Sequence, residues 1–309
     1  MRVLNLVTNQ NAGFYEQQVA SLARQGVEQT TLAVPGQRRV SDDAEESRSI
    51  LDYLRFYPPA LRRGLDGYDV VHANYGLTAP AALAQPTRPV VLSCWGSDLL
   101  GRYGAVVRWC ASRADAVIVM SEEMADLVDA DCHVIPHGVD LSLFRPMPQQ
   151  PAREAVGWRA DAKQVLFPYS PGRAIKDYPR AERVVSAVDE RLDADVELQT
   201  LSGVPHERMP VYMNAADSLL LTSHHEGSPN SVKEAMAVNL PVVATDVGDV
   251  RERLDGVAPS RVAGSDEDLI DGLAAVLERG PPSNGRAAIE PLGLDRMGER
   301  ILSVYDSVR

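Results

Sequence analysis

Short apolar runs rich in β-branched residues alternate with longer helix-like stretches from the first residue of the chain onward. In the first half, the runs predict strands near residues 3–7, 30–34, 70–73, 90–94, 116–120 and 134–135. In the second half, they predict strands near residues 165–169, 196–200, 219–222, 242–245 and 261–263. This alternation is typical of a mostly parallel sheet covered by helices. The pattern occurs twice and therefore predicts an α/β protein with two sheets.

A proline- and glutamine-rich segment, residues 146–151, interrupts the alternation and predicts a linker between domains. We place an N-terminal Rossmann-like domain at residues 1–147 and a C-terminal one at residues 148–293. Apolar side chains at helical spacing predict that residues 294–309 form an amphipathic helix, able to pack back on the N-terminal domain. Two doubly wound domains that face each other leave a cleft along the carboxyl ends of their strands, where ligands bind.

Length and composition limit the classes of function. The 309 residues suffice for two domains of about 150 residues each. The net charge of -12 disfavours a nucleic-acid partner. Three cysteines without ligand spacing predict neither a disulfide framework nor a zinc site. The chain starts with a predicted strand and lacks an apolar run of about 18 residues, so we expect a cytoplasmic protein with at most peripheral membrane contact.

Lysine is nearly absent from the chain. Only Lys163, Lys176 and Lys233 occur, and arginine supplies the other 28 of the 31 basic residues. This balance resembles that of salt-adapted, halophilic proteins. A genomic base bias would also replace lysine with arginine, and the sequence leaves both interpretations open.

The most informative stretch, residues 221–237, leaves a predicted strand and enters a predicted helix. It reads Leu-Thr-Ser-His-His-Glu-Gly-Ser-Pro-Asn-Ser-Val-Lys-Glu-Ala-Met-Ala. Ser228 suits an N-cap and Pro229 the first helical position, while Asn239 followed by Pro241 supplies a stop. The amino-terminal N–H groups of such a helix can hold an anionic diphosphate.

Two glutamates of this stretch are candidate ligand-binding residues. Glu226 precedes the predicted helix, and Glu234, more than one turn into it, could accept hydrogen bonds from a vicinal diol. Each glutamate alone would be interpreted as a solvated surface residue. The strand-Glu-Gly-Ser-Pro-Asn-helix frame around them favours a binding site.

In this frame the chain resembles glycosyltransferase family 4, whose members have the GT-B fold and a paired-glutamate motif. The resemblance covers nearly the whole chain and includes residues 135–140 with Phe144, residues 215–217 and residues 241–248. It implies two Rossmann-like, doubly wound domains that face each other across a cleft. It also implies that Glu226 contacts the donor hexose and Glu234 the ribose hydroxyls. The donor-binding residues expected beside them are Gly227, Ser228, Pro229 and Asn230.

A second element of the predicted donor site follows the first strand of the C-terminal domain. Residues 169–176 read Tyr-Ser-Pro-Gly-Arg-Ala-Ile-Lys, in which Gly172 precedes two cations. Arg173 and Lys176 could neutralise a departing nucleoside diphosphate. Family members usually space this pair more widely, and solvated loop charges are the alternative. A lysine retained in a chain so poor in lysine suggests that a compact point charge is needed at Lys176.

Polar residues in the N-terminal domain are the candidates for the acceptor side. Gly13 follows the first strand and would let the backbone approach the diphosphate, with an ordinary turn as the alternative. His72 and Asp98 lie near the ends of two predicted strands, and Asp98 is the expected catalytic carboxylate there. His72 could instead be a satisfied core histidine. Many relatives carry a histidine where this chain has Trp95, so no histidine role is transferred to that position.

No metal ion or other cofactor is expected. His137, and His224 with His225 beside Glu226, could suggest ligation by imidazole and carboxylate. Enzymes of the resembled fold generally stabilise the leaving diphosphate with a helix dipole and cations, so metal ligation is not expected at these histidines. The expected substrate is therefore a UDP- or GDP-sugar without a bound metal.

The resemblance implies retaining hexosyl transfer to a glycan or polyprenyl-linked acceptor, in the synthesis of surface polysaccharide or glycoprotein glycans. Residues 51–63 mix aromatic residues with arginines and could rest on an anionic membrane surface. The alternative for this segment is a helix with a solvated basic face, broken by Pro58 and Pro59. Two other functions stay open: a catalytically idle GT-B subunit that scaffolds a partner, and a sugar-nucleotide epimerase of the same fold.

Overall fold

The computed structural model describes residues 1–36, 39–41, 44–46 and 48–309. These form two compact units: unit 1 comprises residues 1–138 and 294–309, and unit 2 comprises residues 139–293. The division falls after Gly138, nine residues before the boundary expected from the sequence. Residues 139–147 belong to unit 2 because Arg286 donates hydrogen bonds to the carbonyls of Leu141 and Phe144 (2.8 and 2.7 Å).

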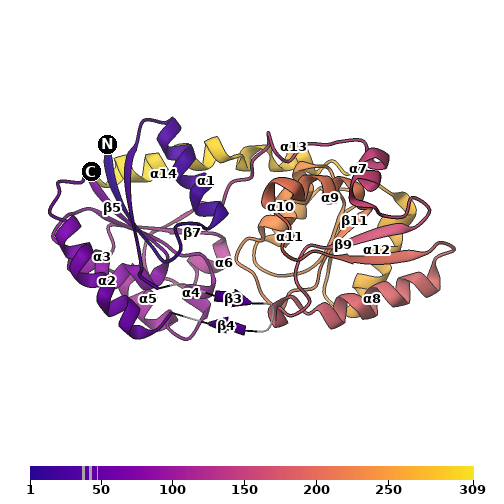
Figure 1. The fold of residues 1–309 in the computed structure, drawn as a ribbon, viewed down its shortest axis with the longest axis horizontal. Helices are drawn as coiled ribbons and strands as arrows, with labels where there is room; N and C mark the ends of the chain where they lie inside the picture. Colours follow the sequence, from indigo (N-terminus) through magenta and orange to yellow (C-terminus); the bar gives the residue numbers. More distant parts are fainter. Residues whose placement is uncertain (37–38, 42–43, 47) are drawn as a thin grey trace. The chain divides into compact units, whose positions relative to one another are not determined.

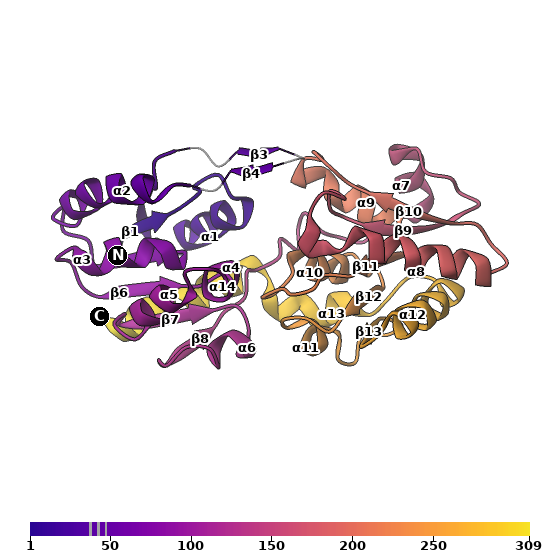
Figure 2. The same cartoon turned by 90° about the horizontal axis from the view of Figure 1, so that it is seen from below.

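Unit 1 contains a parallel sheet in the order β2-β1-β5-β6-β7-β8. Its strands are β1 (Arg2–Val7), β2 (Glu28–Ala33), β5 (Val70–Asn74), β6 (Val90–Ser93), β7 (Ala116–Val119) and β8 (Cys132–Val134). Figure 2 shows β6, β7 and β8 side by side at one end of the sheet. All six strands predicted for this half are confirmed, with shifts of one to two residues at their ends. A separate antiparallel pair consists of β3 (Arg39–Ser41) and β4 (Ala44–Glu46).

Helices cover both faces of the unit 1 sheet. On one face α1 (Gly13–Arg24) packs with α14 (Leu294–Val308), and on the other α2 (Ile50–Arg63), α3 (Ala79–Ala84) and α5 (Gly104–Ala111) lie together (Figure 1). The short helices α4 (Ser97–Leu100) and α6 (Glu122–Ala125) follow β6 and β7.

Helix α14 is the terminal helix that the sequence predicts. Its yellow ribbon lies among the indigo and purple elements of unit 1 (Figure 1). Ser21 Oγ donates to the carbonyl of Leu294 at 2.7 Å. A Cβ on Gly298 would lie 2.2 Å from Ser21 Oγ, so a side chain at this position would separate α14 from α1.

Helix α2 corrects the expectation that Pro58 and Pro59 break it, because the helix is continuous through both prolines. A capping box between Ser49 and Asp52 starts it, and the buried Phe56 anchors it to the sheet. Pro58 lies on the exposed side, where carbonyl oxygens without a helical partner can bond to water.

Unit 2 contains a parallel sheet in the order β10-β9-β11-β12-β13. Its strands are β9 (Lys163–Phe167), β10 (Val196–Thr200), β11 (Ser218–Leu221), β12 (Val242–Thr245) and β13 (Arg261–Ala263). All five strands predicted for this half are confirmed. Residues alternate between two cores: Val165 and Leu220 face one, while Leu166 and Leu219 face the other.

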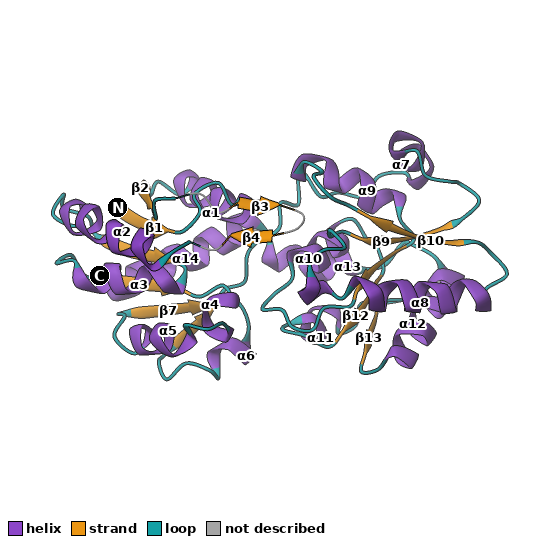
Figure 3. Cartoon of the chain, turned by 60° about the horizontal axis from the view of Figure 1, so that its bottom comes forward, coloured by secondary structure: helices purple, strands orange, loops and turns teal. Residues whose placement is uncertain are grey.

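The helices of unit 2 form two layers around this sheet. The pair α8 (Tyr178–Arg191) and α12 (Asp266–Arg279) packs on one face, away from α10 (Asn230–Ala237) and α13 (Gly285–Ile289) (Figure 3). The remaining helices are α7 (Gln149–Val156), α9 (Met209–Ala215) and α11 (Val250–Leu254).

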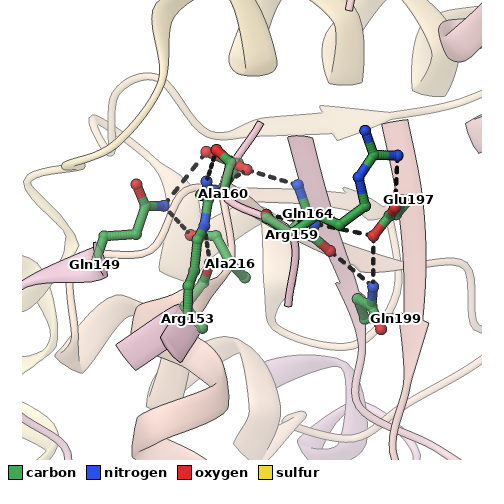
Figure 4. A network of polar contacts seen from close by, with 10 residues as sticks. Gln149, Arg153, Arg159, Ala160, Gln164, Glu197, Gln199 and Ala216 are labelled. Carbon is green, nitrogen blue, oxygen red and sulfur yellow. Dashed lines mark hydrogen bonds and ion pairs between the residues drawn. The ribbon is translucent and has the colours of Figure 1, made fainter. Parts of the chain in front are cut away.

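Residues 146–151 are not a free linker, because α7 begins within them, with Pro148 at its N-cap. Arg153 of α7 forms a buried ion pair with Asp217, at 2.5 Å between nitrogen and oxygen. Gln149 Nε2 donates to the carbonyl of Ala216 at 2.8 Å (Figure 4). Polar side chains hold this helix in place, so the segment lacks the apolar periodicity of a packed helix. For this reason the sequence predicted a linker where the structure has the start of α7.

Candidate functional site

Each sheet reverses its winding direction at one place. In unit 1 the chain leaves β1 for β2 and then returns to β5 on the other side of β1. In unit 2 it leaves β9 for β10 and then continues at β11 on the other side of β9. Ligands of open α/β sheets bind at such switch points, outside the carboxyl ends of the strands. The loops after β1 and β5, and those after β9 and β11, therefore lie where a ligand would bind.

In unit 2 the switch point brings Lys176 and Glu226 together, although 50 residues separate them in the chain. Lys176 Nζ donates to Glu226 Oε1 and lies 3.9 Å from the centre of the Tyr169 ring. Ser223 Oγ also donates to Glu226 Oε1, at 2.7 Å. Burial lowers the pKa of Lys176, and the Glu226 carboxylate opposes this shift. The pair is a nearly buried cation with a carboxylate that holds it in position.

The loops that carry this pair are fixed to each other. Thr222 Oγ1 donates to the carbonyl of Lys176 at 2.8 Å, and the His224 N–H donates to the carbonyl of Ile175 at 3.0 Å. Arg173 and Gly172 lie exposed in the same turn. The Arg173 guanidinium carbon lies 5.7 Å from the centre of the Tyr169 ring. Arg173 and Lys176 therefore both lie near the Tyr169 ring, but Arg173 is exposed whereas Lys176 is buried.

Glu234 lies in α10, as the sequence predicts, and accepts a hydrogen bond from His206 Nε2 at 2.8 Å. That hydrogen bond raises the pKa of His206. Asn230 is the first residue of α10, and its buried Oδ1 has no hydrogen-bond partner among the residues that the structure describes. A buried acceptor without a partner is uncommon and is a position where a ligand hydroxyl could bind.

Helix α10 begins one residue later than expected. Pro229, and not Ser228, is the N-cap residue, and it makes no side-chain cap hydrogen bond. Ser228 Oγ donates instead to Asp249 Oδ2 at 2.7 Å. The buried carboxylate competes successfully for the hydroxyl, so the predicted N-cap role of Ser228 is wrong.

A buried charged cluster behind this loop was missed by sequence reasoning. Lys233 of α10 is 1% exposed, and burial lowers its pKa to about 8, with Asp249 as the charge that most opposes the shift. Gly227, one of the expected donor-binding residues, accepts a hydrogen bond from the Asp249 N–H at 3.2 Å. Gly248 has a φ of +54°, and a Cβ there would lie 2.3 Å from the Gly227 oxygen. The scarcity of lysine, used for Lys176, applies equally to Lys233 and could have identified it.

In unit 1, Asp98 is 2% exposed and its carboxylate accepts backbone N–H groups. The donors are Gly76 (2.7 Å), Trp95 (2.9 Å), Gly96 (2.9 Å) and Leu99 (3.1 Å). Burial raises the pKa of Asp98, and these donors oppose the shift. Both oxygens are occupied by backbone donors, so the geometry favours a positioning role over the catalytic role expected from the sequence.

His72 does not reach a ligand, which corrects its assignment to the acceptor side. Its side chain is 0% exposed, Nδ1 lies 2.6 Å from Tyr305 Oη, and Nε2 lies 2.7 Å from Ser93 Oγ. Burial lowers the pKa of His72 to about 3. It is the satisfied core histidine that the sequence left open as the alternative, and it connects α14 to the sheet.

Four rings that sequence reasoning did not group lie at the carboxyl edge of unit 1, and we name them the aromatic cluster: Phe14, Tyr75, Trp95 and His137. Phe14 stacks on His137 with 4.5 Å between ring centres, and meets Trp95 edge to face at 4.7 Å. Tyr75 lies 5.6 Å from Trp95. Gly13, the predicted diphosphate contact, is the exposed first residue of α1, directly before Phe14.

Tyr75 has a strained backbone, with a φ of 128°. A non-glycine residue in such a region costs about 1–3 kcal/mol and persists only where its surroundings hold it there. Thr78 N and Oγ1 both donate to the Tyr75 carbonyl, at 2.9 and 2.8 Å, and the Tyr75 N–H donates to Ser93. A Cβ on the next residue, Gly76, would lie 2.4 Å from a Val107 methyl group, so a side chain there requires the buried Val107 to shift.

In the part of the chain that the structure describes, no group of three or more His, Cys, Asp or Glu side chains could hold a metal ion. Nor does any helix in it combine the length and apolar character needed to cross a bilayer.

Two parallel α/β units of this kind define the GT-B class of folds, and solved structures agree. Sucrose-phosphate synthase from Thermosynechococcus elongatus matches with a TM-score of 0.75 at 16% identity, over 99% of both chains. WaaG, a glycosyltransferase involved in lipopolysaccharide biosynthesis, matches with a TM-score of 0.68 at 14% identity, over 100% of this chain and 99% of WaaG. At such identities the likeness shows the fold alone, which is the predicted GT-B class.

Sequence comparison identifies the family. The model of Glycosyltransferase Family 4 matches residues 3–143, and the model of Glycosyl transferases group 1 matches residues 177–279. This chain belongs to the glycosyltransferases of the family 4 and group 1 type, and its enzyme class is transferase, so the resemblance seen in the sequence is confirmed.

Curated relatives are glycosyltransferases as well. The putative teichuronic acid biosynthesis glycosyltransferase TuaC of Bacillus subtilis is 28% identical over 59% of this chain and 54% of its own length. The lipopolysaccharide core biosynthesis mannosyltransferase LpcC of Rhizobium leguminosarum bv. viciae is 28% identical over 81% of this chain and 80% of its own length.

Proposed function

We propose that this chain transfers a hexose from a UDP- or GDP-sugar to a hydroxyl group of a glycan or lipid-linked acceptor, with retention of anomeric configuration and without a metal ion. The observation that carries the proposal is the contact of Lys176 with Glu226 at the switch point of unit 2. A nearly buried cation at a sheet edge suits the charge that develops on a departing diphosphate. The Anabaena protein HepE, which has the same fold, has been crystallised with UDP and with UDP-glucose.

The donor would be held by groups around the start of α10. The diphosphate would lie near the N–H groups of Gly227 and Asn230 and near Lys176, with Arg173 approaching from the exposed turn. Glu234 would accept the ribose hydroxyls, and His206, its hydrogen-bond partner, would then share the carboxylate with the donor. Glu226 would contact the hexose while it keeps Lys176 in position.

The transfer step breaks the bond between the anomeric carbon and the β-phosphate oxygen and forms a bond from that carbon to the acceptor oxygen. The hydroxyl proton passes to an oxygen of the leaving diphosphate. Both events take place on one face of the sugar, so the configuration is retained and no enzymic nucleophile is required. Lys176 would stabilise the negative charge that accumulates on the diphosphate. Analysis of the anomeric configuration of the product by NMR tests this step directly.

We also propose a peripheral membrane contact through α2. Ile50, Leu54 and Leu61 are 67%, 58% and 38% exposed and recur at helical spacing along α2. Arg55, Arg62 and Arg63 lie in the same helix and would meet an anionic lipid surface. Co-sedimentation with vesicles that contain anionic lipid, compared with neutral vesicles, tests the contact. Binding that Leu54→Glu does not weaken would contradict it.

The test of the main proposal is a screen of UDP- and GDP-sugars for protection against thermal unfolding. We expect one nucleotide sugar to raise the unfolding temperature, and Glu234→Ala to bind it about tenfold or more weakly. Glu278→Ala, which removes an exposed carboxylate from a helix of the same unit, is the matched control and should behave like wild type. Failure of every nucleotide sugar would favour a scaffold subunit, and a free altered sugar as product would favour an epimerase.

A further inference from the structure

Tyr169 connects two segments at the switch point of unit 2. Its ring centre lies 3.9 Å from Lys176 Nζ, on the loop after β9. Its hydroxyl forms a hydrogen bond with Ser231 Oγ, in the first turn of α10. The ring also meets the buried Phe167 edge to face, with 5.3 Å between ring centres. One side chain therefore touches both the loop that carries Lys176 and the helix that carries Glu234.

The Tyr169 ring lies where it acts on the charge of Lys176. The Lys176 side chain is 7% exposed, so its ammonium group has lost most of its hydration. The face of an aromatic ring attracts a cation within about 6 Å of its centre, and the attraction is stronger where water is excluded. Glu226 supplies the opposite charge through its hydrogen bond with Nζ. The ammonium therefore has two stabilising partners, a carboxylate and a ring face.

We infer that Tyr169 is a positioning residue of the donor site: its ring keeps the Lys176 ammonium in place and charged, and its hydroxyl fixes the start of α10 to the same loop. This inference rests on the proposed function, in which Lys176 stabilises the leaving diphosphate. Ser231 follows Asn230, the first residue of α10, so the hydroxyl bond holds the helix end that faces the proposed donor. The cation and the helix N-terminus would act on the same diphosphate, so the distance between them has to be fixed.

Other charged or titratable side chains lie on the loops and the helix around Lys176. They are Arg173, Asp177, His224, Glu226 and Glu234. A substitution of Tyr169 leaves all of them in the chain, so its effect on Lys176 reports on the ring. Burial raises the pKa of the Tyr169 hydroxyl, whereas burial lowers the pKa of Lys176. The phenol is therefore neutral throughout the pH range in which Lys176 titrates.

Competitive labelling with trace acetic anhydride measures the titration of Lys176 without any ligand. Lysine occurs only three times in the chain, so each amine is read from its own peptide, and Lys163 serves as the internal reference. In Tyr169→Leu we expect Lys176 to lose its proton at lower pH, and to react about twofold to fivefold faster at pH values below its midpoint. Tyr169→Phe keeps the ring and should give the wild-type profile. A midpoint that stays unchanged in Tyr169→Leu, or moves to higher pH because water enters, would overturn the inference.

Tyr169→Phe and Ser231→Ala test the hydroxyl separately. Each should raise the KM for the nucleotide sugar about threefold to tenfold with kcat within about twofold of wild type, and the double variant should lose no more than either single one. Additive losses would reject the link to α10. Tyr212→Leu, which removes another half-buried ring of unit 2, is the control and should change neither the labelling nor the KM.

Labelling and turnover together separate this inference from the proposed function. A shifted Lys176 midpoint in a protein that binds no nucleotide sugar would support the hold of the ring on Lys176 and reject the proposed donor site. Turnover of a nucleotide sugar with an unshifted midpoint would reject the role of Tyr169 and leave the proposed function standing. If Tyr169→Leu does not fold, Tyr169→Met, which has a flexible side chain without a ring, takes its place in the labelling.

Discussion

The carboxyl edges of the two sheets carry opposite chemistry. In unit 2 the switch point gathers charges: Lys176 with Glu226, and Glu234 with His206. In unit 1 the corresponding edge carries the aromatic cluster, and the Asp98 carboxylate beside it is occupied by backbone N–H groups. Two sheets of the same construction therefore carry different side chains at the same edge, charged groups in unit 2 and aromatic rings in unit 1. The charged edge is the one that we propose binds the diphosphate of the donor.

The largest effect should come from removing the cation of the charged edge. We expect Lys176→Met to lower the turnover of the nucleotide sugar about 10²–10³-fold, because the developing charge on the diphosphate loses its buried partner. Turnover is measured as release of UDP or GDP.

The matched control for that variant is Lys163→Met, since Lys163 is another of the three lysines and begins β9 in the same unit. It should keep wild-type turnover. If Lys176→Met turned over the nucleotide sugar as fast as Lys163→Met does, Lys176 would not stabilise the leaving diphosphate, and the charged edge would have no such role.

The next effect concerns stability of the charged edge. Asp249→Ala leaves the buried Lys233 ammonium without its main opposing charge and should destabilise the protein by about 3–5 kcal/mol. The double variant Lys233→Met/Asp249→Ala should recover much of this loss, because the unpaired buried charge is then gone. Urea denaturation of the two variants measures the difference. Additive losses in the double variant would show that the two charges do not interact.

A smaller effect is expected from Asp98 in unit 1. Asp98→Asn replaces one acceptor oxygen by an N–H group that faces backbone donors, and should lower stability by about 1–3 kcal/mol. The KM for the acceptor should rise while the KM for the nucleotide sugar stays within about twofold of wild type. If only the KM for the nucleotide sugar rose, Asp98 would act on the donor side, and its assignment to the acceptor side would be wrong.

Most of the fold could be predicted from the sequence, because buried parallel strands are short, apolar and β-branched. Sequence motifs could indicate candidate site residues where these lie close together in the chain, as Glu226 and Glu234 do, and these assignments stay predictions. The aromatic cluster comes from four separate segments of the chain, the start of α1 and three loops, so no local sequence pattern predicts it. His72 lies in the middle of β5 and Asp98 in α4, and not at strand ends. The side-chain directions that bury them depend on packing against Tyr305 and on loop N–H groups. Segment 146–151 was mistaken for a linker since its helix is held by polar contacts.

Two histidines, one in each unit, predict opposite pH dependences of the free energy of unfolding. His72 has a pKa lowered to about 3, below its ordinary value of 6.5, so its contribution to stability is complete above pH 6.5. That contribution should decline as the pH falls from 6.5 toward 3, by about 1.4 kcal/mol per pH unit. We expect His72→Asn to flatten the slope of unfolding free energy between pH 7 and 5.5. An unchanged slope would show that His72 is not buried in its neutral form.

His206 should show the opposite sign and the smallest effect. Its pKa is raised by the hydrogen bond to Glu234, so the stabilising contribution is present below pH 6.5 and is lost as the pH rises through the raised pKa. The imidazole is 41% exposed, and solvent screening keeps the effect small. Because the same carboxylate is proposed to accept the ribose, His206→Gln should alter the pH dependence of donor affinity above pH 6.5 more than it alters stability. Titration of the nucleotide at several pH values measures this. A variant with the wild-type pH profile would mean that Glu234 binds the donor without involving His206, or does not bind it.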